Sequence, residues 1–170
     1  DGGSVDDGGS SDDGGSGQEP NPENYSWTFG TSTYELVKSS LDFTTAATAA
    51  ADAGGYLAEI NTSEENSNVF SNVFEQINTS EYGETTASDG GGSAYVWLGG
   101  SDSASEGTWK WITSGDDILL SRSEWGSGQL GQEPDNYNNQ DGLALGLENW
   151  PSGYSDGEGY GNAGSWNDVD

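Results

Sequence analysis

The sequence predicts an α+β domain that follows an acidic arm, and three observations support this class. The composition changes after Pro22, two helix-like patterns come next, and short strand-like segments divided by Gly- and Asn-rich stretches fill the second half. Helices that precede a run of strands are typical of α+β folds, in which helices gather beside antiparallel sheets. We therefore expect a single domain over residues 26–170, a length that one hydrophobic core accommodates.

Residues 1–25 are predicted to form a flexible acidic arm. As far as Gly17 they contain only Asp, Gly, Ser and a single Val, and the motif Asp-Gly-Gly-Ser occurs three times. This composition has almost no apolar surface to bury, and repulsion among the carboxylates keeps the chain extended. Weak calcium binding by these carboxylates is an alternative, although the ligand spacing of a known calcium loop is missing.

The domain is predicted to begin with a strand and a helix. Residues 34–37 alternate in polarity as a strand does. Asp42 stands at the N-cap of a helix that the glycine pair Gly54-Gly55 would end. The residues of this helix expected to face inward are Phe43, Ala46, Ala47 and Ala50.

A second strand and a second helix are predicted to follow. Residues 56–60 are expected to form a short strand. Thr62 and Glu65, three residues apart, predict the capping box of the second helix. The residues of this helix expected to face inward are Val69, Phe70, Val73, Phe74 and Ile77.

The second half of the chain predicts short strands joined by loops. The expected strands are residues 94–98, 108–112, 143–147 and 165–169. Six of the seven Trp residues lie in this half. A fold with little helix needs large side chains to fill its interior, so we expect most of these Trp residues in the core.

The charge of the chain excludes several classes of partner. Thirty acidic residues face three basic ones, and without His the formal charge is -27. Nucleic acid is excluded because binding to phosphates depends on Lys and Arg. Membrane insertion is not expected, since no apolar run approaches the roughly 20 residues that a span requires. The absence of Cys and His leaves oxygen ligands, which calcium prefers, and a divalent cation is the first partner to consider.

One loop concentrates oxygen donors. Most of residues 132–141 (Gln-Glu-Pro-Asp-Asn-Tyr-Asn-Asn-Gln-Asp) carry a side-chain carboxylate or carboxamide. Calcium takes about six to eight oxygen ligands, so this composition is typical of a chelating loop. A solvated Asn-rich turn is the alternative, and the composition of the loop does not separate the two.

Four motifs, in order, resemble those of a known family. They are residues 54–61 (Gly-Gly-Tyr-Leu-Ala-Glu-Ile-Asn) followed by Glu64-Glu65-Asn66, then Val96-Trp97-Leu98-Gly99-Gly100, then Glu133-Pro134-Asp135, and then Trp166-Asn167-Asp168. From Ser26 to Asp170 the chain thereby resembles a C-type lectin-like domain. The resemblance implies a fold of two helices, short antiparallel sheets and a long calcium-binding loop.

The resemblance also implies a principal calcium site and a sugar site around it. The calcium ligands would be Glu133, Asp135, Gln140, Asn167 and Asp168, with the peptide bond before Pro134 in the cis form. Two vicinal hydroxyls of a hexose would bind the ion, and the residues implied in sugar binding are Glu133, Asp135, Gln140, Asn167 and Tyr137.

An accessory calcium site is implied by a further local resemblance. Residues 101–109 (Ser-Asp-Ser-Ala-Ser-Glu-Gly-Thr-Trp) are similar to a family stretch whose acidic residues bind a second ion. The implied ligands are Asp102, Glu106, Asn136, Gln140 and Asp141. A polar turn before a strand is the alternative.

The chain departs from the family pattern in three ways. The triplet is Glu-Pro-Asp, and the loop has Gln140 where the family usually has Glu, so an amide and a carboxylate have changed places. The disulfides of the family are absent. The last strand of the family is also expected to be missing, because the chain stops at Asp170; this would leave an open sheet edge. The chain begins at Asp1 rather than Met, and we expect it to be a mature or excised piece.

The predicted function is a secreted or cell-surface lectin or adhesin module that binds glycans through calcium. No catalysis is expected, because the chain has neither His nor Cys to supply a base near neutrality. The alternative is a structural or self-assembling domain that binds protein instead of sugar. Self-association would then use the N-terminal arm or the open sheet edge.

Overall fold

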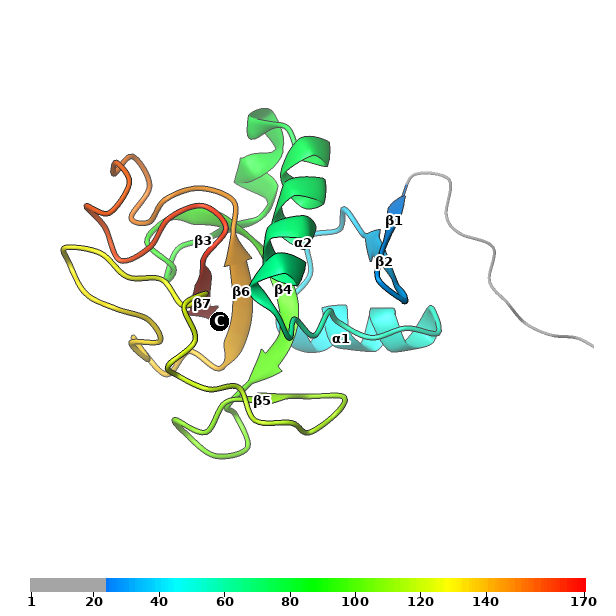
Figure 1. Ribbon diagram of the computed structural model, residues 1–170. Helices are drawn as coiled ribbons and strands as arrows, with labels where there is room; N and C mark the ends of the chain where they lie inside the picture. The colour runs from blue at the N-terminus through cyan, green and yellow to red at the C-terminus, as the bar shows by residue number, and fades with distance from the viewer. Residues whose placement is uncertain (1–23) are drawn as a thin grey trace, which may run out of the picture.

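The computed structural model describes residues 24–170, so the predicted arm lies almost entirely outside the described residues (Figure 1). The fold starts with a hairpin of β1 (Tyr25–Phe29) and β2 (Ser32–Leu36). Strand β1 thus begins one residue before the predicted domain boundary. Trp27 stacks between Tyr25 and Tyr34, with ring centroids 5.6 and 5.3 Å away. The first contact runs along β1, and the second crosses from β1 to β2 and helps to hold the two strands together.

The first helix, α1 (Phe43–Asp52), forms as predicted at its N-terminus but is buried less deeply than expected. The carboxylate of Asp42 accepts a hydrogen bond of 2.8 Å from the backbone N–H of Thr45. The four residues expected to face inward are half-buried, and none is fully buried. The apolar face consists mainly of Ala, which covers the sheet without filling a deep space. Phe43 makes the main aromatic contact, edge-on to Trp97 at 5.4 Å.

The second helix, α2 (Ser63–Gln76), has the predicted N-cap. The Thr62 hydroxyl accepts from the backbone N–H of Glu65 at 3.1 Å. Val69 and Val73 are buried in the core as predicted. The placement of Phe74 in the core was wrong: its side chain is 46% exposed and packs sideways on Phe70. A 3-10 helix, η1 (Thr79–Glu84), follows α2 and was not predicted.

The predicted strand over residues 56–60 was also wrong. This segment has no strand conformation, and Tyr56 is 59% exposed. It crosses strand β4 (Ser93–Ser101) at one point, where the backbone N–H of Gly99 donates to the carbonyl of Ala58 at 2.8 Å. A Cβ atom on Gly99 would lie 2.6 Å from the carbonyl oxygen of Leu57. The glycine permits a close crossing of two backbones, which the alternation of side chains does not distinguish from strand pairing.

The main sheet is antiparallel, and its strands lie in the order β3 (Thr86–Ala87), β4, β6 (Gly142–Gly146) and β7 (Trp166–Val169), with β5 (Lys110–Trp111) paired to β4. Strands β4, β5, β6 and β7 overlap the four segments predicted for the second half. In Figure 1 the helices and the hairpin lie on one side of this sheet, and the long loops between β5 and β7 lie on the other. The α+β fold class is thereby confirmed.

The core contains most of the Trp residues of the second half, as predicted, whereas Trp97 is partly buried. Trp109, Trp125, Trp166 and Trp111 form a chain of edge-on contacts with centroids 5.1 to 5.9 Å apart. Trp150 belongs to a smaller cluster with Tyr95, on the side of the sheet near the long loops. Among the described residues, no helix has the length and apolar composition that crossing a bilayer requires.

Candidate metal centre

Three carboxylates meet between the long loop and the last strand. Glu133, Asp135 and Asp168 each present an oxygen, and these oxygens lie within 4.8 Å of one another. Within residues 24–170 this is the only group of three or more acidic, His or Cys side chains arranged in this way. Glu133 is 4% exposed, Asp168 is fully buried, and Asp135 lies on the surface. The group therefore has two buried members and one open to solvent.

Backbone hydrogen bonds fasten the loop to β7. The Glu133-Pro134 bond is cis, as predicted, and the chain then turns across the end of the Asp168 side chain. The backbone N–H groups of Asp135 and Asn136 donate to the two carboxylate oxygens of Asp168, at 3.3 and 2.7 Å. Asn136 has a positive φ of 53°, a conformation that Asn tolerates better than most residues. Asp168 is thus a ligand candidate that also positions the loop.

Glu133 has one oxygen with a partner and one without. Its Oε1 accepts from Trp150 Nε1 at 2.8 Å, whereas Oε2 is buried and has no hydrogen-bond partner among the described residues. Burial, together with repulsion from Asp168 and Asp135, raises the pKa of Glu133 to about 8. A buried carboxylate oxygen with no donor is costly unless a cation or a proton satisfies it. The donor set of hard oxygens fits a divalent cation such as calcium.

Two predicted amide ligands line the same cleft. Gln140 is 2% exposed, and its Nε2 donates to Asp89 Oδ2 at 3.1 Å. Asn167 is 2% exposed, and its Nδ2 donates to the Tyr95 hydroxyl at 2.9 Å. Because both amide nitrogens are engaged, the carbonyl oxygens are the atoms left for a cation. Gln140 and Asn167 share this cleft with Glu133 and Asp135.

Tyr137 and Asp89 complete the cleft. Tyr137, predicted as a sugar contact, lines it and is 59% exposed. Asp89 was not predicted, because it lies in the loop between β3 and β4 and belongs to none of the recognised motifs. Its Oδ2 accepts from the backbone N–H of Asp170 as well as from Gln140. Only folding brings it to the site.

The residues of the implied accessory site are divided between two places. Asp102 is 2% exposed; its Oδ2 accepts from the backbone N–H of Gly107 at 2.8 Å, and its buried Oδ1 has no partner among the described residues. Burial and the Glu106 carboxyl raise the pKa of Asp102, and burial and Asp102 raise the pKa of Asp141. Asn136 and Gln140 instead contact Asp168 and Asp89. The accessory site stays a prediction.

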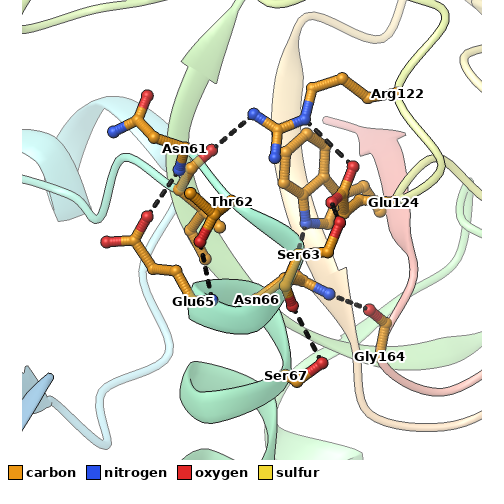
Figure 2. Close-up of polar contacts among 11 residues, drawn as sticks. Asn61, Thr62, Ser63, Glu65, Asn66, Ser67, Arg122, Glu124 and Gly164 are labelled. Atoms are coloured by element: carbon orange, nitrogen blue, oxygen red, sulfur yellow. Dashed lines mark hydrogen bonds and ion pairs between the residues drawn. The ribbon is translucent and has the colours of Figure 1, made fainter.

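A polar cluster behind the site holds the start of β7 (Figure 2). Arg122 pairs with Glu124 at 3.1 Å, donates to the carbonyl of Ile60 at 2.8 Å, and lies over the Trp166 ring at 4.7 Å. Glu124 also accepts from the Ser63 hydroxyl at 2.6 Å. The cluster therefore joins the N-terminus of α2 to the strand that carries Asn167 and Asp168.

Gly126 connects both sides of the site. Its backbone N–H donates to the carbonyl of Trp166 at 2.9 Å, and its carbonyl accepts from the backbone N–H of Glu133 at 2.8 Å. Trp166 also donates to the carbonyl of Glu124 at 2.7 Å. This pairing covers the beginning of the outer edge of β7, the last strand in the order of the main sheet. One backbone segment thus touches the strand and the loop that supply the carboxylates.

The four sequence motifs now have places in the fold. The first joins α1 to the start of α2, and the second lies in β4. The third forms the cis turn at Pro134, and the fourth lies in β7 directly against that turn. The four motifs by which the chain resembles a C-type lectin-like domain thus lie in one folded unit. Within this domain the carboxylate group of Glu133, Asp135 and Asp168 lies where the long loop meets β7.

Similar proteins were found by sequence and by structure. No family model matches the chain. Over 88 residues the chain is 35% identical to a perlucin-like protein from Mytilus galloprovincialis, a match that covers 52% of this chain and 44% of that protein. The chain therefore matches less than half the length of this relative. The mouse and human scavenger receptor C-type lectin carbohydrate-recognition domains each share 21% identity, with a TM-score of 0.46, over 75% of this chain and 72% of theirs.

Proposed function

We propose that this domain binds glycans through a calcium ion held by Glu133, Asp135, Gln140, Asn167 and Asp168. The observation that supports this most is the buried Oε2 atom of Glu133, which has no hydrogen-bond partner within residues 24–170 and lies beside two further carboxylates. A cation would satisfy this atom and offset the repulsion among the three acids. With one oxygen each, the three carboxylates and the two amides on the same cleft supply five ligands, and two sugar hydroxyls would bring the number to seven, within the roughly six to eight that calcium uses.

The bound ion would coordinate two vicinal hydroxyls of a hexose, since calcium accepts ligands beyond those of the protein. The role of the protein residues is to orient that pair. Carboxylate oxygens of Glu133 and Asp135 accept hydrogen bonds from sugar hydroxyls, whereas an amide such as Asn167 can also donate. The exposed ring of Tyr137 would contact an apolar face of the sugar.

Binding without catalysis is the form of this function that the residues favour. One carboxylate oxygen of Glu133 and one of Asp168 lie within 4.8 Å of each other. Glycosidase pairs are spaced by about 5 Å or more and need one acid free to donate a proton. A shared calcium would hold both carboxylates ionised. We expect the module to act outside cells, where calcium reaches the concentrations that weak extracellular sites require, about 10⁻⁴ to 10⁻³ M.

Calorimetry with calcium followed by a sugar column tests the proposal. Calcium should bind, and immobilised hexoses should retain the protein until a chelator releases it. Glu133→Gln should lower calcium affinity by about a hundredfold or more, because it removes a buried charged ligand. Glu75→Gln, an exposed position on α2 with the same change of charge, is the matched control and should bind normally. Calcium binding by Glu133→Gln at the unmodified affinity would contradict the proposal.

A further inference from the structure

The calcium candidate lies in a cleft that continues beyond the ligands. One part has a volume of about 230 Å³ and includes Glu133, Asp135 and Trp150. The adjoining part has a volume of about 270 Å³ and includes Asn138 and Asp170. Both parts share the residues Ser88, Asp89, Tyr137 and Gln140. A sugar placed on the ion would therefore extend over Asp89, which lies where the two parts join.

The cleft stays negative after a cation binds. A divalent ion balances two of the three carboxylates in the group of Glu133, Asp135 and Asp168. Asp89 and Asp170 remain in the wall, and neither has a positive partner in the described part of the chain. All three basic residues of the chain lie in the described part and pair elsewhere: Lys38 with Glu81, Lys110 with Asp117 and Arg122 with Glu124. No basic side chain lines either part of the cleft.

Asp89 is held in a fixed position. Its Oδ2 accepts from Gln140 Nε2 at 3.1 Å and from the backbone N–H of Asp170 at 2.7 Å. Its neighbour Gly90 accepts from the Tyr95 hydroxyl at 2.6 Å and packs so closely on Tyr95 that an added Cβ atom would lie 2.7 Å from the ring. A carboxylate anchored in this way cannot swing aside to make room for a negatively charged ligand.

We infer that this cleft selects glycans by charge, and that Asp89 is the main determinant. The cleft binds hexoses that are neutral or carry an amine, and it rejects hexoses that carry a carboxylate or a sulfate. This inference rests on the proposed function. The exact orientation of the sugar ring matters little, because charges interact over a screening length of about 10 Å at moderate ionic strength, and this length exceeds the width of a hexose.

A matched set of three sugars tests this inference. Titrations in saturating calcium would compare a methyl hexoside, the same sugar with an amine at C6, and its uronic acid. At about 20 mM salt we expect the amine sugar to bind most tightly and the uronic acid roughly tenfold or more weakly. The spread should shrink at about 0.5 M salt. A uronic acid that binds as tightly as the neutral sugar would overturn the inference.

The variant Asp89→Asn isolates the determinant. An Asn side chain still offers an oxygen to Gln140 and to the N–H of Asp170 but carries no charge. It should reduce the preference between amine sugar and uronic acid severalfold. Asp52→Asn, at the exposed end of α1, makes the same change in net charge away from the cleft and should leave the preference intact. An unchanged preference in Asp89→Asn would refute the role of Asp89.

The outcomes separate this inference from the proposed function. If no neutral sugar binds in calcium, the proposed function fails and the inference fails with it. If neutral and anionic sugars bind equally, the glycan function stands and only the charge selection is wrong. Measuring calcium affinity of Asp89→Asn in the absence of sugar shows whether the loss of charge acts on the ion, through Gln140, or on the sugar directly.

Discussion

Glu124 and Glu133 are both almost fully buried, but they differ in their hydrogen-bond partners and in the direction of their pKa shifts. Both oxygens of Glu124 have partners, Arg122 and Ser63, whereas one oxygen of Glu133 has none among the described residues. Burial alone would raise the pKa of Glu124, but these hydrogen bonds outweigh it and the pKa lies below its usual value. The pKa of Glu133 is raised to about 8. One region carries its own cation, and we propose that the other takes a cation from solution.

The largest effect is expected where the internal cation is removed. Arg122→Met should lower the free energy of unfolding by about 3–5 kcal/mol, with calcium or without it, because Glu124 would stay buried without its partner. Urea denaturation measures this. The control is Lys110→Met, which breaks an ion pair on the surface and should cost about 0–1 kcal/mol. Equal losses of unfolding free energy in the two variants would show that the buried ion pair contributes no more to stability than the surface ion pair.

Calcium should stabilise the buried carboxylate of Glu133 as Arg122 stabilises that of Glu124. At a calcium concentration one hundred times its dissociation constant, the unmodified protein should gain about 2.7 kcal/mol of unfolding free energy. Glu133→Gln should lose most of this gain. In a chelator, however, it should be at least as stable as the unmodified protein at neutral pH, since an amide costs less to bury than a carboxylate. A strongly destabilised Glu133→Gln in chelator would show that Glu133 has a structural role like that of Glu124.

The pH dependence should distinguish the two regions more finely. The folded pKa of Glu133, about 8, lies above its ordinary value of 4.5, so the folded state holds a proton that the unfolded chain releases. This favours folding below pH 4.5 and is lost as the pH rises toward 8. In chelator the unmodified protein should lose more stability over this range than Glu133→Gln. Saturating calcium should remove the difference, and parallel curves in chelator would contradict the assignment.

The smallest effect concerns the exposed rim of the cleft. Tyr137→Ala should weaken glycan binding by about 0.5–1.5 kcal/mol, because one aromatic contact is lost, and should leave calcium affinity and stability unchanged. Tyr56→Ala is a matched control, since both rings are 59% exposed and Tyr56 lies outside the cleft. Titration with a neutral methyl hexoside measures both variants. Equal affinities in the two would remove Tyr137 from the sugar site.

Local signals in the sequence predicted much of this fold. The caps at Asp42 and Thr62 depend on residues three positions apart, and the structure has both hydrogen bonds. The central strands β4 and β6 have long apolar runs and were predicted within about one residue at most ends, except where β4 extends further. The third and fourth motifs led to Glu133, Asp135 and Asp168, which the structure places together.

Features that depend on contacts distant in sequence could not be predicted. Residues 56–60 have the composition of a strand, yet a glycine in β4 lets them cross it instead of pairing. Asp89 reaches the cleft only because β3 and β4 pair and Gln140 lies opposite. The pairing of Arg122 and Glu124 is visible in the sequence as two nearby charges, but their burial follows from α2 and Trp166 packing over them.

The backbone of Gly126 has a consequence for protein engineering. Its N–H and its carbonyl fasten strand β7 and the Glu133 loop to each other, and a methyl group in place of its hydrogen would overlap the Trp150 ring. The Trp150 side chain in turn donates to Glu133. Grafting the acidic loop alone onto another scaffold would separate these parts. A successful transplant has to carry the 124–126 segment and the indole as one unit.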